Sequence, residues 1–260
     1  MEKLKSKSLI VFDLDGTVIP TKSPMDKEMA KLIVKLLAIK KVAIIGGGKY
    51  GIFKELFLQR LKAPKKLLKN LFLFPTTSTS FYRYHQGWKK IYSLGLTKRQ
   101  RDKIKKTFSR VLQEINYQHP KKTYGKVIED RGTQVTFSAL GQDVAAVLGK
   151  KGVRLKKKWK REHTDTKMKI TKLMAKYLPS LEVHAAGYTS VDVTKKGIDK
   201  AYGLRQIEKH LHIKLEDMVF IGDAISPGGN DYAVTKTGVD YLQVSGPTET
   251  KKIIRQILSS

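Results

Sequence analysis

Short apolar runs that end in acidic or glycine residues recur along this chain, with helix-like stretches between them. Residues 8–12 form one such run, which Asp13-Leu14-Asp15-Gly16-Thr17 follows directly. Runs of similar length occupy 42–45, 71–74, 218–221 and 241–244. Buried parallel strands are nearly continuously apolar, and strands that alternate with helices form βαβ units. The pattern predicts an α/β fold built on a parallel sheet.

The helices of this fold are expected between the apolar runs. Ser23-Pro24-Met25-Asp26 predicts a helix start, with Ser23 as the cap and proline in the first turn. Apolar residues at helical spacing follow it as far as Leu37. Further helices are expected over 50–61 and 198–210 and from about residue 248 onward.

The middle of the chain has a different character. Between 97 and 194 the sequence predicts a basic helix, a β-like stretch at 133–137, a second basic helix through 167–177 and a strand at 190–193. This order is typical of helices packed on an antiparallel sheet. We therefore expect an inserted α+β domain at 97–194, and an α/β core formed by 1–96 and 195–260.

Composition excludes several classes of protein. The chain of 260 residues contains no cysteine, which excludes disulfides, thiolate zinc sites and a catalytic thiol. No apolar run approaches the roughly 20 residues of a membrane span, and the run before Asp13 is too short for a signal peptide. These features favour a cytoplasmic protein without a membrane partner.

The formal net charge of +29 makes nucleic acid an obvious possible partner. The insert is the more basic part per residue, with 23 basic and 9 acidic residues. However, the basic residues are scattered and do not alternate with aromatic ones, as base stacking would favour. We therefore expect a solvated surface that attracts small phosphorylated substrates, and we do not expect nucleic acid as a partner.

Two acidic pairs stand at the carboxyl ends of predicted strands, where open α/β sheets place their sites. The first is Asp13 with Asp15, and the second is Asp223 with Asp231. Carboxylates gathered at one sheet edge repel one another unless a cation lies between them. Oxygen ligands of this kind predict a Mg²⁺ site.

The same residues meet the needs of phosphoryl transfer. A carboxylate beside the metal can attack phosphorus, and a second one two residues later can move the proton. Lys200 would supply positive charge, and the backbone N–H groups of Gly47 and Gly48 would bind phosphate. Asp-x-Asp-Gly alone is also a common turn sequence. The order of all these features along the chain favours the functional interpretation.

Three motifs resemble those of the haloacid dehalogenase superfamily of Mg²⁺-dependent phosphotransferases. They are Phe12-Asp13-Leu14-Asp15-Gly16-Thr17, Gly197-Ile198-Asp199-Lys200, and the segment from Gly222-Asp223 to Asn230-Asp231. The insert resembles the type IIB cap of that superfamily in length and position. Arg131-Gly132-Thr133, Ser190-Val191-Asp192-Val193 and Pro227-Gly228-Gly229-Asn230-Asp231 are similar to segments of the eukaryotic-type phosphomannomutases.

The resemblance implies a Rossmann-like core and a role for each matched residue. Asp13 would be the nucleophile that forms an aspartyl-phosphate, and Asp15 the general acid and base. Mg²⁺ would be held by the Asp13 side chain, the Asp15 carbonyl and Asp223. Asp231 would support the metal or orient Lys200, and Asn230 would lie near the phosphate. Arg131, Ser190 and Asp192 would face the substrate from the cap, through which a homodimer is also implied.

Two departures from the family bear on the reaction. Gly48 stands where the superfamily has a Ser or Thr that binds phosphate. Ser138 and Gly149 stand, in an ungapped comparison, where the mutases have further cap arginines. Because a mutase must retain a bisphosphorylated intermediate, losing two such clamps favours a hydrolase acting on a sugar phosphate. A phosphomannomutase is the first alternative, and a nucleic-acid-binding protein with a vestigial site is the second.

Overall fold

The computed structural model describes residue 4 and residues 6–259, and it contains two compact units. The core unit comprises the chain up to Ser93 together with the chain from Asp199 onward, and the insert unit is Leu94–Ile198. The predicted insert, 97–194, lies within the second unit. In the described part of the chain, no helix combines the length and the apolar character needed to cross a membrane.

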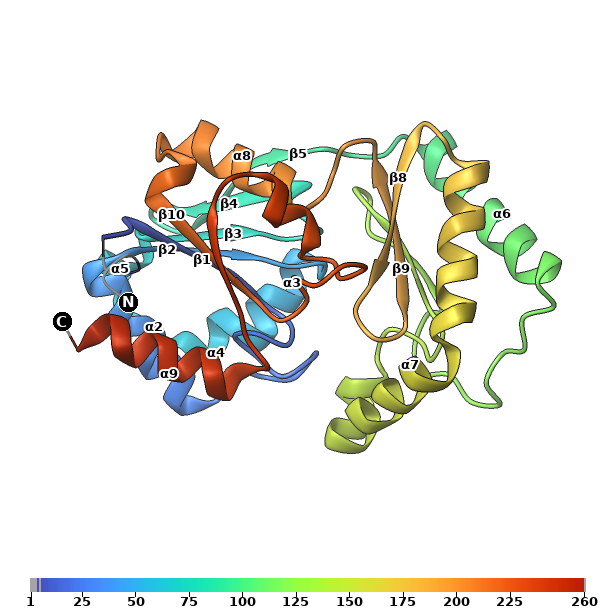
Figure 1. Ribbon diagram of the computed structural model, residues 1–260, viewed down its shortest axis with the longest axis horizontal. Coiled ribbons are helices and arrows are strands. Elements are labelled where there is room, and N and C mark those ends of the chain that lie inside the picture. Colours follow the sequence, from blue (N-terminus) through green and yellow to red (C-terminus); the bar gives the residue numbers. More distant parts are fainter. Residues whose placement is uncertain (1–3, 5, 260) are drawn as a thin grey trace. The chain divides into compact units, whose positions relative to one another are not determined.

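A seven-stranded sheet forms the centre of the core unit (Figure 1). Five strands are parallel, in the spatial order β11 (Asp240–Gln243), β10 (Met218–Gly222), β1 (Leu9–Asp13), β2 (Lys41–Ile45) and β3 (Leu71–Phe74). The sequence predicted all five, and the expected α/β fold is confirmed. Their carboxyl ends meet at one edge, where the predicted acidic residues lie.

Two further strands, β4 (Ser80–Tyr84) and β5 (Trp88–Ser93), extend this sheet in the antiparallel sense. They were absent from the prediction of a purely parallel sheet. Charged residues such as Arg83, Lys89 and Lys90 interrupt the apolar character of both strands. β5 is an edge strand and is mostly exposed, so burial imposes no apolar pattern on it.

Helices cover both faces of the core sheet because the strand residues alternate in direction (Figure 1). Ile10 and Phe12 of β1 pack in one apolar cluster with α2 (Lys27–Ile39) and α9 (Pro247–Leu258). Leu9 and Val11 pack in the other, with α8 (Lys200–Leu211). The first cluster also includes α3 (Tyr50–Ile52), a π-helical segment (Phe53–Leu58) and α4 (Gln59–Leu61), near which lies α5 (Lys65–Leu68).

The start of α2 differs from the prediction. Asp26, and not Ser23, is the N-cap residue, and its Oδ1 accepts a hydrogen bond from the Met29 N–H at 2.8 Å. The helix therefore begins at Lys27, after the proline. Asp26 is equally suited to this role, because its carboxylate satisfies a free N–H and faces the positive end of the helix dipole.

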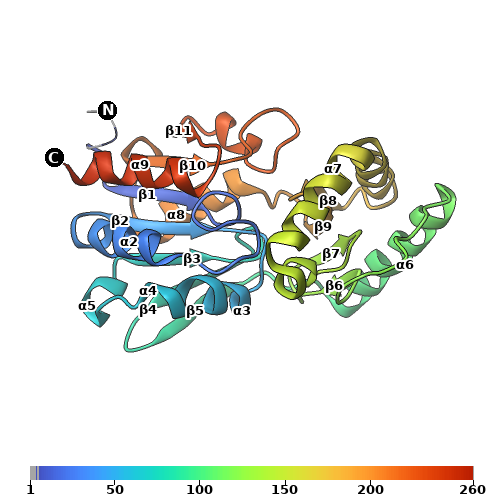
Figure 2. The same cartoon turned by 90° about the horizontal axis from the view of Figure 1, so that it is seen from below.

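The insert unit is a four-stranded antiparallel sheet in the order β6-β7-β9-β8, packed against two helices (Figure 2). Its strands are β6 (Ile128–Asp130), β7 (Val135–Ser138), β8 (Leu181–Ala186) and β9 (Ser190–Lys195), and its helices are α6 (Lys98–Glu114) and α7 (Val144–Tyr177). The helix α7 is interrupted by non-helical backbone at Gly149 and His163. The sequence did not predict β6 and β8, which are largely polar or only partly buried.

Candidate active site

Asp13 is the last residue of β1 and is almost fully buried. Its Oδ1 accepts a hydrogen bond from the ammonium of Lys200 at 2.5 Å. Its Oδ2 is buried and has no hydrogen-bond partner among the described residues. Burial, and the nearby carboxylates of Asp231 and Asp223, raise the pKa of Asp13 well above its ordinary value, although Lys200 opposes them. One carboxylate oxygen is thus held in place, and the other is buried without a hydrogen-bond partner among the described residues.

Lys200 occupies the first turn of α8, directly after the N-cap Asp199. Its side chain is buried, and its ammonium forms ion pairs with Asp13 and Asp231. Burial acts to lower the pKa of Lys200, but these two carboxylates raise it above its ordinary value. The lysine is therefore charged at every physiological pH and holds two carboxylates from different segments together.

Asp223 and Asp231 bracket the loop that follows β10. Asp231 is fully buried, and its Oδ2 accepts a hydrogen bond from the Ala224 N–H at 3.2 Å. Asp223 is partly exposed, and burial together with the Asp231 charge raises its pKa to about 6. Gly16 has a φ of +93°, and a Cβ there would lie 2.5 Å from the Asp223 Oδ2. Glycine is thus required where the two acidic segments approach each other.

The three carboxylates form a group that could hold a metal ion. Asp13, Asp223 and Asp231 each offer one oxygen, and these oxygens all lie within 4.8 Å of one another. Three carboxylates face a single lysine, so a divalent cation would balance the charge. The buried Oδ2 of Asp13, which has no hydrogen-bond partner in the described chain, and the raised pKa values of Asp13 and Asp223 also fit a hard cation with oxygen ligands.

Asp15 lies in the turn after β1, and its carboxylate is not one of these three metal-binding groups. Its Oδ1 accepts a hydrogen bond from the Lys22 N–H at 2.6 Å. Its charge contributes to the raised pKa of Asp223, so the two side chains are near each other. That Asp15 binds metal through its carbonyl, and acts as acid and base, stays a prediction.

The glycines after β2 are hydrogen-bonded to the loop that follows β3. The carbonyls of Gly46 and Gly48 accept hydrogen bonds from the N–H groups of Thr77 and Thr76, at 2.9 and 2.8 Å. Residues 76–78 follow β3 and all have positive φ, which costs energy in residues other than glycine. The Ser78 hydroxyl is buried without a hydrogen-bond partner in the described chain. In the sequence, this loop could have been recognised as a candidate part of the site by its run of hydroxyl residues, 76–80, directly after a buried strand.

The predicted substrate-binding residues of the insert lie on its sheet. On the paired strands β7 and β9, Asp192 lies opposite Thr136 and Ser190 lies opposite Ser138. The Thr136 hydroxyl donates a hydrogen bond to Asp192 Oδ1 at 2.7 Å. Arg131 is mostly buried, forms an ion pair with Glu129 at 2.8 Å and donates to Gln142. These residues belong to the insert unit, whereas the carboxylate group belongs to the core unit. Asn230 lies beside Asp231 and is partly exposed. The binding roles of Gly47, Gly48, Asn230, Arg131, Ser190 and Asp192 stay predictions.

Curated relatives match the chain over nearly its full length. It is 28% identical over 262 residues to a phosphomannomutase of Encephalitozoon cuniculi. The aligned region covers 97% of this chain and 94% of that relative. The chain is 26% identical over 262 residues to a phosphomannomutase of Saccharomyces cerevisiae, covering 99% of this chain and 96% of the relative.

Solved structures of phosphatases share the fold. An IMP-nucleotidase of Plasmodium falciparum superimposes with a TM-score of 0.71 at 17% identity, over 98% of this chain and 69% of that one. A trehalose-6-phosphate phosphatase of Aspergillus fumigatus superimposes with a TM-score of 0.56 at 14% identity, over 100% of this chain and 97% of that one. At these identities the likeness concerns the fold alone.

The family itself is shown by the sequence. The model of the eukaryotic phosphomannomutase family matches residues 29–260, which is most of the chain, including Lys200, Asp223 and Asp231. The match begins after Asp13 and Asp15, but the relatives described above cover that segment too. With its carboxylate and lysine cluster suited to phosphoryl transfer, the chain belongs to the eukaryotic phosphomannomutase family.

Proposed function

We propose that this protein is a Mg²⁺-dependent phosphohydrolase that acts on a small phosphorylated metabolite, most simply a sugar phosphate. The observation that carries the proposal is the buried Asp13 carboxylate. Lys200 holds one of its oxygens at 2.5 Å, and the other has no partner in the described chain. This arrangement suits an oriented nucleophile.

The proposed metal site consists of the Asp13 side chain, Asp223 and the Asp15 backbone carbonyl, with Asp231 orienting Lys200. The fit rests on the three clustered carboxylate oxygens and on their excess of negative charge over the single lysine. When bound, Mg²⁺ would neutralise charge on the phosphoryl oxygens and lower the repulsion that Asp13 meets as it approaches them.

The proposed reaction has two steps. An Asp13 oxygen forms a bond to phosphorus as the bond to the leaving alcohol breaks, and Asp15 donates a proton to that alcohol. Asp15, now a carboxylate, takes a proton from water, and the water oxygen attacks the phosphorus of the aspartyl-phosphate. Phosphate leaves and the Asp13 carboxylate is restored. The hydrogen bond from the Lys22 N–H holds Asp15 for both transfers.

Two positions of the insert favour hydrolase activity over mutase activity. Ser138 is buried, and its hydroxyl is bonded to the Gly141 carbonyl at 3.1 Å and to the Thr189 hydroxyl at 3.2 Å. Gly149 has no side chain. Neither position offers a cation, and the guanidinium of Arg131 is paired with Glu129. A bisphosphorylated intermediate would therefore lack two of the clamps that a mutase needs.

Phosphomannomutase activity is the second candidate, and membership of the family favours it. The two activities differ in their products. A mutase interconverts hexose 1- and 6-phosphates with little release of free phosphate, and a bisphosphate stimulates it. A hydrolase releases phosphate and leaves no isomerised sugar phosphate.

The experiment measures phosphate release and sugar-phosphate isomers from one reaction, by phosphorus NMR. The panel contains hexose 1- and 6-phosphates with and without hexose 1,6-bisphosphate, trehalose 6-phosphate and IMP, each with Mg²⁺ or EDTA. We expect Mg²⁺-dependent release, which Asp13→Asn lowers by about 10⁴-fold or more without loss of the folded state. Isomer without release would establish the mutase, and full activity in Asp13→Asn would exclude both.

A further inference from the structure

The basic residues of α6 fall into two sets. Arg101 and Lys105 are partly buried, and both pair with Asp130, at 3.1 and 2.9 Å. The others are exposed, and none has an acidic partner within ion-pair distance in the described chain. This second set comprises Lys98, Arg99, Lys103, Lys106 and Arg110. The structure thus neutralises the cations of α6 that face the insert sheet and leaves the outward ones unpaired.

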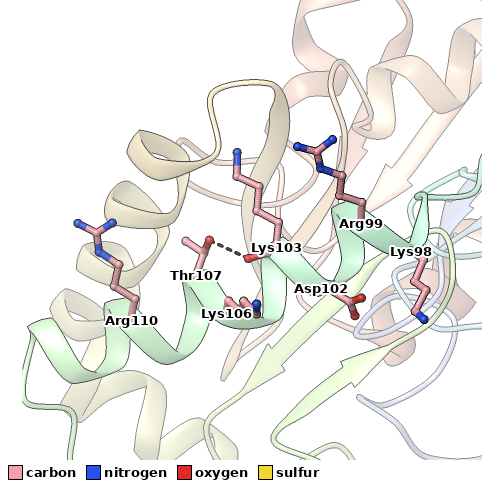
Figure 3. Close-up of a pocket in the computed structure, with 7 residues that line it drawn as sticks. All are labelled: Lys98, Arg99, Asp102, Lys103, Lys106, Thr107 and Arg110. Atoms are coloured by element: carbon pink, nitrogen blue, oxygen red, sulfur yellow. Dashed lines mark hydrogen bonds between the residues drawn. The ribbon is translucent and has the colours of Figure 1, made fainter.

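Four of the unpaired cations lie in a row, which we call the basic ladder: Arg99, Lys103, Lys106 and Arg110. Because they are spaced four, three and four residues apart, their Cα positions lie within about 60° of arc around the helix axis. Along the axis the row extends over about 16 Å. In Figure 3, Arg99, Lys103 and Arg110 extend to the same side of α6. Together with Lys98, Asp102 and Thr107, the ladder lines an open cavity of about 820 Å³.

Two contacts shape the ladder without neutralising it. The Arg110 guanidinium lies over the ring of Tyr177, with 4.1 Å between the guanidinium carbon and the ring centre. Asp102, the one acidic residue lining the cavity, lies 3.5 Å from Lys105, which is outside the ladder. The ladder therefore presents a net positive row whose last member is held in place by stacking.

Apart from the stacking of Arg110 on Tyr177, the charges of the ladder do not favour the folding of α6. Like charges three and four residues apart repel one another along a helix. Lys98 and Arg99 lie in a first turn that contains no acidic residue, and there they oppose the helix dipole. The helix is instead held by its buried face, including Ile104 and Phe108, and by a capping box at Thr97. An external anion bound along the row would offset this repulsion and would give these cations a role.

We propose that the basic ladder binds the phosphate backbone of duplex nucleic acid. A straight row of cations about one helical turn apart matches a linear polyanion, and Arg99 and Arg110 offer forked donors to phosphate. The cavity is lined by no aromatic residue that could stack on a base. Contacts would therefore be to the backbone and independent of base sequence. The basic residues of the whole chain are scattered, but the turns of α6 gather these four on one face of the helix.

Other occupants fit this face less well. A membrane needs an apolar helix face to enter the lipid, and that face of α6 is already buried in the insert core. A second copy of this chain would bring an identical row of cations against the first. An acidic protein would find no apolar or aromatic anchor among the lining residues.

The test uses fluorescence anisotropy with a fluorescein-labelled 20-base-pair DNA duplex of mixed sequence. With four phosphate contacts, raising NaCl from 50 to 200 mM should weaken binding by about 100-fold. The triple variant Arg99→Gln/Lys103→Gln/Lys106→Gln should lower the magnitude of the slope of log affinity against log salt by about 2.7, or 0.9 per lost contact. Its phosphate release should be unchanged, because these residues are remote in sequence from the proposed catalytic set and belong to the other unit.

A matched control removes the same charge elsewhere. Lys27→Gln/Lys31→Gln/Lys35→Gln takes three exposed lysines from one face of α2 in the core unit, and it should leave the salt slope as in the unmodified protein. Equal loss in both variants would assign binding to net charge and overturn the ladder. Equally strong binding of poly-glutamate at matched charge, tighter binding to anionic vesicles than to the duplex, or no duplex binding at 150 mM NaCl would overturn the nucleic-acid assignment.

Discussion

At the scale of single residues, the buried charges of Lys200 and Lys167 have opposite environments. Lys200 lies between the carboxylates of Asp13 and Asp231, so burial is compensated by two ion pairs. Lys167 is almost as buried, but its ammonium donates to the Gly187 carbonyl at 3.0 Å, and the nearby Asp192 carboxylate only partly offsets burial and the charge of Lys160. The first lysine should stabilise the fold, and the second should weaken it.

Replacing Lys200 should leave two buried carboxylates without their cation. We expect Lys200→Met to lower the free energy of unfolding of the core unit by about 3–5 kcal/mol in EDTA. Urea unfolding followed by Trp88 fluorescence in a Trp159→Phe background would measure it. Adding Asp231→Asn to Lys200→Met should recover part of the loss, since one uncompensated charge is removed. A loss of less than 1 kcal/mol would show that the ion pairs are not important for stability.

The stability of the insert unit should depend on pH through Lys167. Burial, with the adjacent Lys160 charge, lowers the pKa of Lys167 to about 8, against about 10.5 in the unfolded chain. Between these values the unfolded chain binds more protons, so stability rises with pH, by up to about 1.4 kcal/mol per pH unit. Lys167→Met should remove this slope between pH 8 and 10.5 and raise stability at pH 7.

The measurement is urea unfolding followed by Trp159 fluorescence in a Trp88→Phe background, since the chain has two tryptophans. The control is Lys169→Met on the same helix, because Lys169 is exposed and its ammonium stays in solvent. This variant should keep the slope of the unmodified protein. The same slope in Lys167→Met would assign it to other groups.

At the scale of elements, α6 shows what residues at the end of a helix add to its apolar face. In α6 the Thr97 hydroxyl accepts from the Gln100 N–H at 3.2 Å, and the Gln100 side chain accepts from the Thr97 N–H at 2.8 Å. This capping box satisfies two N–H groups at the end of a helix whose first turn is basic. Local sequence thus sets where α6 starts, even though its charges oppose the dipole.

Removing this cap should weaken the insert unit by about 1 kcal/mol. Thr97→Ala leaves the Gln100 N–H without its acceptor, and urea unfolding followed by Trp159 fluorescence would show the change. Ser109→Ala is the matched control, because the exposed Ser109 hydroxyl only donates back to the Lys105 carbonyl within α6. That variant should change stability by a few tenths of a kcal/mol. Equal effects of both would mean that the cap does not matter.

At the scale of the whole molecule, the apolar cores of the two units do not mix. The two clusters around the core sheet draw residues from the core unit alone, and the third cluster draws residues from Leu94–Ile198 alone. The insert is also continuous in sequence, whereas the core unit is made of two segments. Each unit therefore has the material for its own cooperative unfolding.

A fragment of residues 94–198 should fold by itself. It contains all the buried residues of its cluster, including Phe108, Phe137 and Trp159. We expect a single cooperative urea transition in Trp159 fluorescence, with a midpoint close to that of the same signal in the full chain. A fragment with a non-cooperative transition or without protected amides would show that the insert depends on the core unit.

Local patterns in the sequence determined much of the fold and of the candidate site. Four of the five parallel strands, β1, β2, β3 and β10, were predictable because they are buried and almost continuously apolar, and β1, β2 and β10 are also ended by glycine or acidic residues. The set of Asp13, Asp15, Lys200, Asp223 and Asp231 was predictable because these residues follow strands or open a helix in a characteristic order. The hairpin of β4 and β5 was not, since an exposed edge strand carries no apolar pattern.

Contacts between distant segments decided what the sequence left open. Met25 packs in the core cluster ahead of α2, so the helix begins only at Lys27. Asp26, and not Ser23, is therefore the N-cap residue. Only the assembled sheet places oxygens of Asp13, Asp223 and Asp231 within 4.8 Å, with Lys200 between two of them. Likewise, Arg101 and Lys105 are neutralised and the basic ladder is not, because Asp130 lies on one side of α6 alone. The sequence by itself determined which elements and charges are present. The tertiary structure decided which charges are paired, because pairing depends on distances across the fold and not along the chain.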